Sequence, residues 1–291
     1  MTLNFEYRSS GNIETDGIMV FVSSDELDCF TSRHALPEEV SSSVELGISS
    51  ELFLGNYNEQ KTFAVPSSKT RMVQICGLGE MKDLTQEKLR RICAKAIRSV
   101  MDTKIDSLTV LISKNLPESF ESGKLIAEAL CLGSYQFKKY KTSDSDDSRS
   151  SQMNVTIFDP FQTSSQNSIE RGVSIARGTN FTRDLGNTAP NDLTPDDLRQ
   201  VAQDLAEASD GKLKFSFFDE EKMSELGMEM FLGVSKGSEV PGRMVFLEYF
   251  PEKAKHTVAL VGKGITFDTG GISLKPGKGM DEMKFDMCGA G

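Results

Sequence analysis

The sequence has 291 residues, a formal net charge of −10, 38% hydrophobic residues and 26% charged residues. This composition is typical of a folded globular protein and does not fit a disordered chain. The negative charge argues against nucleic acid or an anionic membrane as a partner, and no apolar run approaches the roughly 20 residues that a membrane-spanning helix needs. At about 150 residues per domain, the length predicts two domains.

Strands and helices alternate through the first part of the chain. Short β-branched and apolar runs predict the strands, and apolar residues recurring three and four positions apart predict the helices. The alternation predicts an α/β domain with a mostly parallel sheet over residues 1–162. Thr85 is the predicted N-cap of the first helix. The predicted strands are residues 17–22, 61–65, 71–76, 108–112 and 154–158, and the predicted helices are residues 85–101 and 121–139.

A two-glycine turn, Cys-Gly-Leu-Gly at residues 76–79, follows one of these strands. Such a turn can approach a phosphate, but the full GxGxxG pattern is absent and no Walker sequence occurs. We therefore favour a structural or assembly role for the first domain over nucleotide binding.

The middle of the chain predicts a boundary between the two domains. The polar, acidic residues 142–152 predict an exposed loop, and a helical pattern follows over residues 164–185. We place a linking helix at residues 163–186. The next helix starts with Thr194 as N-cap and a proline at its first position. Further elements are predicted at residues 212–217 (strand), 220–226 (helix), 228–238 (helix or turn) and 244–249 (strand).

The charged residues of greatest interest lie in residues 261–291. Residues 256–262 predict a short buried strand, which would place Lys263 at the carboxyl end of a sheet, where α/β proteins bind ligands. Asp268 and Asp286 follow at spacings of five and then eighteen residues. Carboxylates in one such pocket repel each other unless a cation neutralises them, so the spacing indicates a metal site. An ordinary ion pair between Lys263 and Asp268 is the alternative that spacing alone leaves open.

The numbers of cysteines and histidines limit the cellular compartment and the metal ligands that we expect. The five cysteines include no CxxC pair, which predicts free thiols in a reducing compartment. The N-terminal residues resemble neither a secretion signal nor a transit peptide, so a cytoplasmic location is predicted. With only two histidines, a bound metal would depend on oxygen ligands, which favours Mn, Mg or Zn. A lysine could join these ligands only as the neutral amine.

Two runs of residues carry a resemblance to a known family. They are Val-Gly-Lys-Gly-Ile-Thr-Phe-Asp-Thr-Gly-Gly-Ile-Ser-Leu-Lys-Pro at 261–276 and Met-x-x-Met-Lys-x-Asp-Met-x-Gly-Ala at 280–290. Both closely resemble the leucine aminopeptidase (cytosol aminopeptidase) family, as does Asn-Thr-Ala-Pro-Asn at 187–191. The resemblance implies a macro-domain-like N-terminal α/β module, a linking helix and, over residues 187–291, the first part of an α/β metallopeptidase domain.

The resemblance also implies a role for each of five residues in the substrate site. Lys263, Asp268 and Asp286 match ligands of a site for two divalent metal ions, Mn or Zn or else Mg, with Asp268 as the bridging ligand. Lys275 matches a catalytic lysine, whose ammonium would stabilise the oxyanion formed during peptide hydrolysis. Met283 matches a residue lining the pocket for the N-terminal side chain of the substrate, and its thioether suits leucine or methionine.

The implied protein is a metal-dependent aminopeptidase that acts on peptides, prefers N-terminal leucine and assembles as a homohexamer. The family's second ligand cluster, Asn-Thr-Asp-Ala-Glu-Gly-Arg-Leu, does not occur within residues 1–291. We therefore expect these residues alone to be inactive. The alternative is a non-catalytic α/β binding or assembly subunit that keeps the fold without the chemistry.

Overall fold

The computed structural model describes residues 2–25, 27, 36–65, 69–142 and 152–291. The chain divides into two compact units, Met1–Asn180 and Phe181–Gly291, and the division falls within helix α5 (Gln166–Asn187). Most of the predicted loop at 142–152 lies outside the described residues. None of the described helices combines the length and the hydropathy needed to cross a bilayer.

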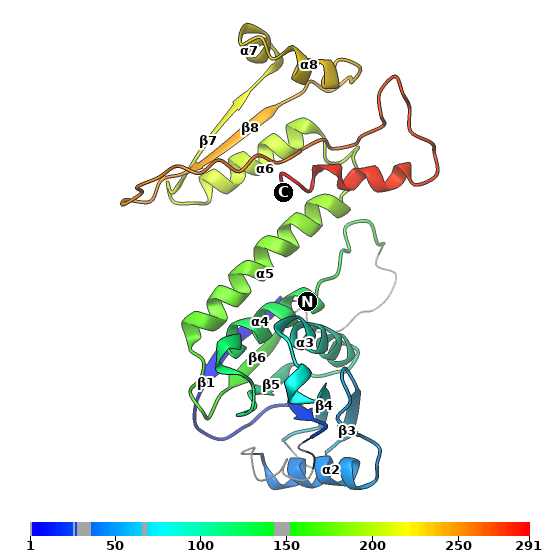
Figure 1. Ribbon diagram of the computed structural model, residues 1–291, viewed down its shortest axis with the longest axis vertical. Helices are drawn as coiled ribbons and strands as arrows, with labels where there is room; N and C mark the ends of the chain where they lie inside the picture. Colours follow the sequence, from blue (N-terminus) through cyan, green and yellow to red (C-terminus); the bar gives the residue numbers. More distant parts are fainter. Residues whose placement is uncertain (1, 26, 28–35, 66–68, 143–151) are drawn as a thin grey trace. The chain divides into compact units, whose positions relative to one another are not determined.

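The first unit is built on a six-stranded sheet with the order β1-β6-β5-β2-β4-β3 (Figure 1). Neighbouring strands are parallel except β3 and β4, which are antiparallel. This arrangement confirms the predicted α/β class with a mostly parallel sheet. The strands are β1 (Thr2–Arg8), β2 (Gly17–Ser23), β3 (Gln60–Ala64), β4 (Met72–Gly79), β5 (Ser107–Leu111) and β6 (Gln152–Phe158).

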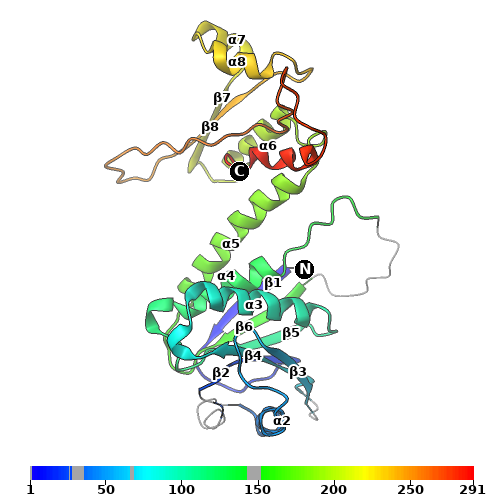
Figure 2. The same cartoon turned by 45° about the vertical axis from the view of Figure 1, so that its right-hand side comes forward.

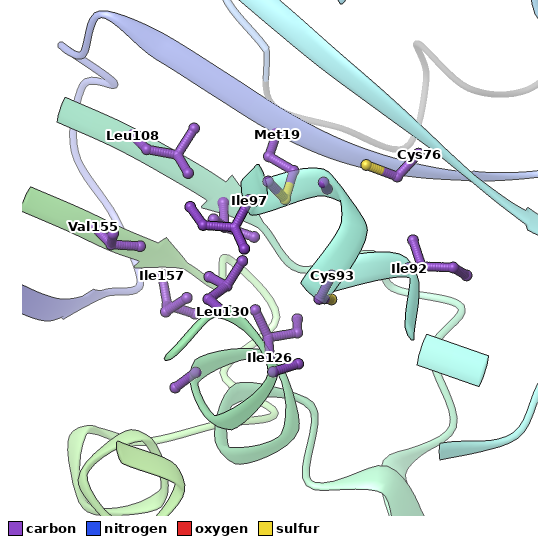
Figure 3. Packing of buried hydrophobic residues seen from close by; sticks show 14 of the residues in the cluster. Met19, Cys76, Ile92, Cys93, Ile97, Leu108, Ile126, Leu130, Val155 and Ile157 are labelled. Atoms are coloured by element: carbon purple, nitrogen blue, oxygen red, sulfur yellow. The ribbon is translucent and has the colours of Figure 1, made fainter. Parts of the chain in front are cut away.

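Helices cover both faces of this sheet. Helices α3 (Gln86–Met101) and α4 (Ser122–Gly133) lie on one face, and α2 (Glu38–Ser49) lies on the other (Figure 2). Because side chains alternate along a strand, Met19 and Phe21 of β2 join the core beneath α3 and α4, whereas Ile18 and Val20 join the core beneath α2. Figure 3 shows the larger core, including Ile97 and Leu130 from the two helices. The continuous apolar pattern of β2 follows from this double coverage.

Helix ends in the first unit follow from local hydrogen bonds. Thr85 accepts a hydrogen bond from the N–H of Lys88 and caps α3, as predicted. The predicted helix at 121–139 is too long, because α4 ends at Gly133. There Ser134 donates its hydroxyl hydrogen bond to the carbonyl of Cys131, a side-chain bond that competes with continuation of the helix.

The glycine turn at the end of β4 is packed against protein backbone. A Cβ atom on Gly77 would lie 2.1 Å from the carbonyl oxygen of Asn56, so a neighbouring loop fills the space that a side chain would need. This close approach requires glycine at position 77 whether or not a nucleotide binds, and it supports a structural role for this turn.

The second unit contains a two-stranded antiparallel sheet of β7 (Leu213–Phe218) and β8 (Met244–Tyr249), with α6 beside it (Figure 1). Thr194 and Asp197 form a capping box at the start of α6, as the predicted N-cap requires. The guanidinium of Arg199 on α6 lies over the ring of Phe217 on β7. The other elements are α6 (Pro195–Glu207), α7 (Glu220–Glu225), α8 (Glu229–Ser235) and the 3₁₀ helix η4 (Met280–Met287).

The predicted buried strand at 256–262 is wrong for this structure. These residues have no regular secondary structure, and Leu260 and Val261 are 94% and 95% exposed. A strand requires a neighbour for its backbone hydrogen bonds, and in the described second unit only β7 and β8 pair with each other. Lys263 therefore follows an extended, exposed segment and does not stand at the edge of a sheet.

Candidate active site

Five side chains predicted from the sequence lie together in the second unit. The Nζ atom of Lys263 lies 3.1 Å from Oδ2 of Asp268 and 2.7 Å from Oδ2 of Asp286. The Nζ atom of Lys275 lies 3.2 Å from the same Asp268 oxygen and 3.9 Å from Oδ2 of Asp286. Lys275 also contacts Sδ of Met283 at 3.0 Å. Two ammonium groups, two carboxylates and a thioether thus form one cluster, which we call the lysine–aspartate cluster.

Close backbone packing brings the two ends of this cluster together. A Cβ atom on Gly262 would lie 2.0 Å from the carbonyl oxygen of Gly289, so only glycine permits this approach. The contact holds the residue before Lys263 against the segment that follows η4. Because Asp286 lies in η4, Lys263 and Asp286 become neighbours despite their separation in sequence.

A small apolar core holds η4 in place. Met287, adjacent to Asp286, is fully buried against Leu185 and Leu193. Leu198 and Val201 of α6 pack around the same core. Because Met287 is buried in this core, the neighbouring Asp286 points toward the lysine–aspartate cluster.

The turn after Asp268 orients its carboxylate. Gly270 adopts φ +88° and donates its N–H to Oδ1 of Asp268 at 2.9 Å. The N–H of Lys275 bonds to the carbonyl of Thr269 at 2.9 Å, which returns the chain to the cluster. One carboxylate oxygen of Asp268 is therefore held by backbone, while the other faces both lysines.

Charge in the cluster is balanced by the lysines. The N–H of Gly270 first, and then the ammonium groups of Lys263 and Lys275, hold the pKa of the Asp268 carboxyl far below its usual range. Hydrogen bonds to Asp286 and then to Asp268 raise the pKa of Lys263. In this geometry the Lys263 ammonium pairs with both carboxylates, and its contact with Asp268 is the ion pair that spacing alone left open.

The same geometry fits a divalent metal ion in part. The Oδ2 atoms of Asp268 and Asp286 converge on one cationic nitrogen within 3.1 Å, and both side chains are about one-quarter exposed. Two carboxylate oxygens and the nitrogen of Lys263, once it has lost its proton, are donors that suit Mn or Zn. Within the described residues, no three His, Cys, Asp or Glu side chains form a cluster suited to a metal, so these donors supply only part of a coordination shell.

Two contacts of the cluster were absent from the sequence prediction. The Gly270 N–H is a main-chain donor to a predicted ligand, and the Lys275–Met283 contact joins a predicted catalytic residue to a predicted pocket residue. The Thr-Gly-Gly sequence is the available signal for the first contact, because successive glycines at a turn often direct N–H groups toward an anion. The Lys275–Met283 contact depends on the backbone conformation between residues 275 and 283, and the sequence there shows no periodic pattern that would predict it.

The fold and this cluster define the class of the protein. It is an α/β protein of two compact units, and its second unit carries two lysines and two aspartates in mutual contact. Family models identify it further. The N-terminal domain of the cytosol aminopeptidase family matches residues 19–144, and the catalytic domain of the same family matches residues 180–291. The chain belongs to the cytosol aminopeptidase family.

Individual relatives support this membership. A probable cytosol aminopeptidase of Acinetobacter baylyi is 39% identical over 238 residues, covering 82% of this chain and 48% of the relative. Another from Acinetobacter baumannii is 34% identical over 275 residues, covering 94% and 55%. The chain thus spans about half the length of the curated relatives it matches.

A solved structure has the same fold. The bottromycin maturation enzyme BotP in complex with Mn superposes with a TM-score of 0.73 at 24% identity, covering 95% of this chain and 54% of that chain. At this identity the likeness concerns the fold alone. It agrees with a mixed α/β fold that corresponds to about half of a longer chain.

Proposed function

We propose that this protein is a metal-dependent aminopeptidase that releases N-terminal residues, preferably leucine, from peptides. The observation that carries the proposal is the convergence of Lys263, Asp268, Lys275, Met283 and Asp286 in a member of the cytosol aminopeptidase family. We further propose that it acts in the cytoplasm as a homohexamer, which rests on the family resemblance.

Three residues would hold the metal. Asp268 and Asp286 offer carboxylate oxygens, and Lys263 offers its nitrogen after giving its proton to solvent. Asp268 is suited to bridge two divalent ions, Mn or Zn or else Mg, because its Oδ2 atom already faces two cations. A divalent metal bound there would polarise the peptide carbonyl and activate water for attack.

Lys275 would stabilise the charge that develops on the peptide oxygen. Its ammonium lies beside Asp268 and is about one-third exposed, so it can face both the cluster and an incoming peptide. A positive charge fixed in advance lowers the transition-state energy because it need not reorganise during the reaction.

Met283 would contact the N-terminal side chain of the peptide. Its sulfur already lies 3.0 Å from Nζ of Lys275, so a side chain bound against it would place the adjacent carbonyl near that ammonium. The flexible thioether suits unbranched and γ-branched apolar side chains such as those of methionine and leucine.

Residues 1–291 alone are proposed to be inactive, since they supply only part of the coordination shell. The catalytic test therefore uses the chain extended to the length of its relatives with the C-terminal segment of the Acinetobacter baylyi protein. Lys275→Ala should lower kcat on leucyl-p-nitroanilide with Mn by about 10²–10³ and leave the metal content unchanged, the loss expected for one oxyanion-stabilising group.

Lys278→Ala is the matched control, because Lys278 is exposed and has no ion pair among the described residues. It should retain the activity of the unsubstituted chain. Loss of metal together with activity in Lys275→Ala would instead make Lys275 a structural residue. Absence of turnover in the extended chain despite bound Mn would favour the non-catalytic alternative.

A further inference from the structure

Strand β3 is one of the two edge strands of the sheet in the first unit. Within the part of the chain that the structure describes, it pairs with β4 and with no other strand (Figure 2). The N–H of Val65 bonds to Arg71, and the carbonyl of Glu59 accepts a bond from Gly77, so odd-numbered residues face β4. By the alternation of an antiparallel ladder, the backbone N–H and C=O groups of Gln60, Thr62 and Ala64 point away from β4.

A groove lies between this edge and α2. Phe63 forms its floor and packs against α2 so closely that a Cβ atom on Gly47 would lie 2.5 Å from the Phe63 ring. Leu46 lies beside it and is 67% exposed. The two carboxylates of Glu38 and Glu39 stand in the first turn of α2 and line the same groove. The groove is therefore apolar at its floor and acidic at its rim.

The charges around this edge complement one another across two copies of the chain. Lys61 is exposed on β3, and its side chain lies on the same face of the sheet as Phe63, since the two are separated by one residue. In the part of the chain that the structure describes, Lys61, Glu38 and Glu39 take part in no ion pair. Among the described residues, the chain thus carries a cation and an acidic groove on the same edge, neither of which has an ion-pair partner there.

We propose that β3 pairs antiparallel with β3 of a second copy about a twofold axis at Thr62. This register uses the outward N–H and C=O groups of Gln60, Thr62 and Ala64, with Gln60 opposite Ala64 of the second copy. It also places Lys61 of one copy directly opposite Phe63 of the other. Residues opposite each other in a ladder have Cβ atoms about 5 Å apart, so the lysine stem lies along the groove floor and its ammonium reaches Glu38 and Glu39.

Symmetry gives this contact twice and extends the sheet across both copies. The inference does not depend on the proposed peptidase function, because every residue involved lies in the first unit. The competing interpretation is that Lys61 only protects a short edge strand from pairing, as lysines on edge strands often do. The two interpretations differ in whether the unsubstituted chain dimerises and in whether two oppositely charge-reversed variants associate when mixed.

The experiment measures self-association of the full chain by analytical ultracentrifugation over a wide range of concentration. Residues 1–291, used here without the C-terminal extension of the catalytic test, should dimerise reversibly; a homohexamer of the extended chain can include the same twofold contact. Lys61→Glu alone, and Glu38→Lys with Glu39→Lys, should each weaken the dimer by about tenfold or more, because each places like charges opposite each other at both symmetric contacts. An equimolar mixture of the two variants should recover dimers, since each variant then meets the opposite charge in its partner.

Lys114→Glu is the control for net charge, because Lys114 is exposed, lies outside the groove and has no ion pair among the described residues. It should dimerise as the unsubstituted chain does. The proposal is overturned if the unsubstituted chain remains monomeric, if the charge-reversed variants associate normally, or if the mixture associates no better than each variant alone. The mixture also guards against a folding defect, which could not be repaired by a second variant.

Discussion

Asp16 joins three segments at the start of the parallel strands. One carboxylate oxygen accepts hydrogen bonds from the N–H groups of Asp106 and Ser107 and from the Ser107 hydroxyl, at 3.0–3.1 Å. The other oxygen lies 3.0 Å from Nη2 of Arg71. Partial burial opposes ionisation, but these hydrogen bonds and the nearby guanidinium lower the pKa of Asp16 overall. The side chain is 28% exposed, so solvent screens the contacts only in part.

Asp16→Asn should destabilise the first unit by about 1–3 kcal/mol at pH 7, because it removes the charge from these hydrogen bonds. The folded-state pKa lies below the unfolded value of about 3.9, so the stabilisation is full above that value. It is lost as the pH falls through the folded-state pKa. Thermal unfolding of both proteins at pH 7 and pH 3 should therefore show a difference that shrinks in acid.

Asp106→Asn is the control for this prediction, since Asp106 lies next to Ser107 in the segment that contacts Asp16, and its exposed carboxylate accepts no hydrogen bond within the described structure. It should change the unfolding temperature little at either pH. A difference between Asp16→Asn and the unsubstituted chain that grows toward low pH would contradict the assigned direction of the pKa shift.

At the same scale, the sequence identified the cluster residues but not their contacts. The motif named Lys263, Asp268, Lys275, Met283 and Asp286, and the structure brings all five together. Spacing could not show that Lys263 contacts both aspartates, because that depends on the backbone contact between Gly262 and Gly289. Such contacts between distant residues leave no periodic signal in the sequence.

Among the secondary-structure elements, α5 packs against α4 through a glycine. A Cβ atom on Gly172 would lie 2.1 Å from the carbonyl oxygen of Lys124, and backbone on both sides leaves little room to adjust. Gly178 lies in the same helix, is exposed and has nothing within 4 Å of such an atom. The two glycines therefore face different physical constraints within one helix.

Gly172→Ala should lower the stability of the first unit by about 1–3 kcal/mol through overpacking. Gly178→Ala should raise stability by about 0.5–1 kcal/mol, because alanine loses less backbone entropy in a helix. Urea unfolding of the two variants measures both effects. Destabilisation by both substitutions to the same extent would mean that α4 and α5 do not approach as closely in solution.

The degree of burial determined which helices and strands the sequence could predict. The buried strands β2, β4 and β5 were predicted because coverage on both faces leaves continuous apolar runs. The sequence prediction omitted β1, which has a largely exposed, polar pattern at the edge of the sheet, and α2, in which four serines lower the intrinsic helix propensity. The strand at 256–262 was predicted wrongly because a local apolar run carries no information on whether a pairing partner is present.

At the scale of the whole molecule, the chain forms two compact units of unequal burial. The first contains both large cores, whereas the core of the second consists of Leu185, Leu193 and Met287 with a few partly buried neighbours. The assignment of residues 1–162, 163–186 and 187–291 as domain, linker and partial domain stays a prediction, since the contact-based division falls within α5. We expect the first unit to be the more stable of the two.

Three strongly exposed apolar residues of the second unit lie in the segment predicted as a strand. Val258, Leu260 and Val261 are 79%, 94% and 95% exposed, so they contribute almost no buried area to the fold. A contiguous apolar segment that is open to solvent favours association with other chains. Replacing all three residues with serine should therefore reduce binding of a hydrophobic dye and slow aggregation, while the unfolding temperature stays unchanged.

Leu193→Ala provides the contrast, because Leu193 is buried in the small core of the same unit. Its removal should cost about 2–5 kcal/mol and increase dye binding. The informative comparison is the unfolding temperature of the triple-serine variant. If it falls as that of Leu193→Ala does, residues 258–261 are buried in solution, and the strand that the sequence predicts forms there after all.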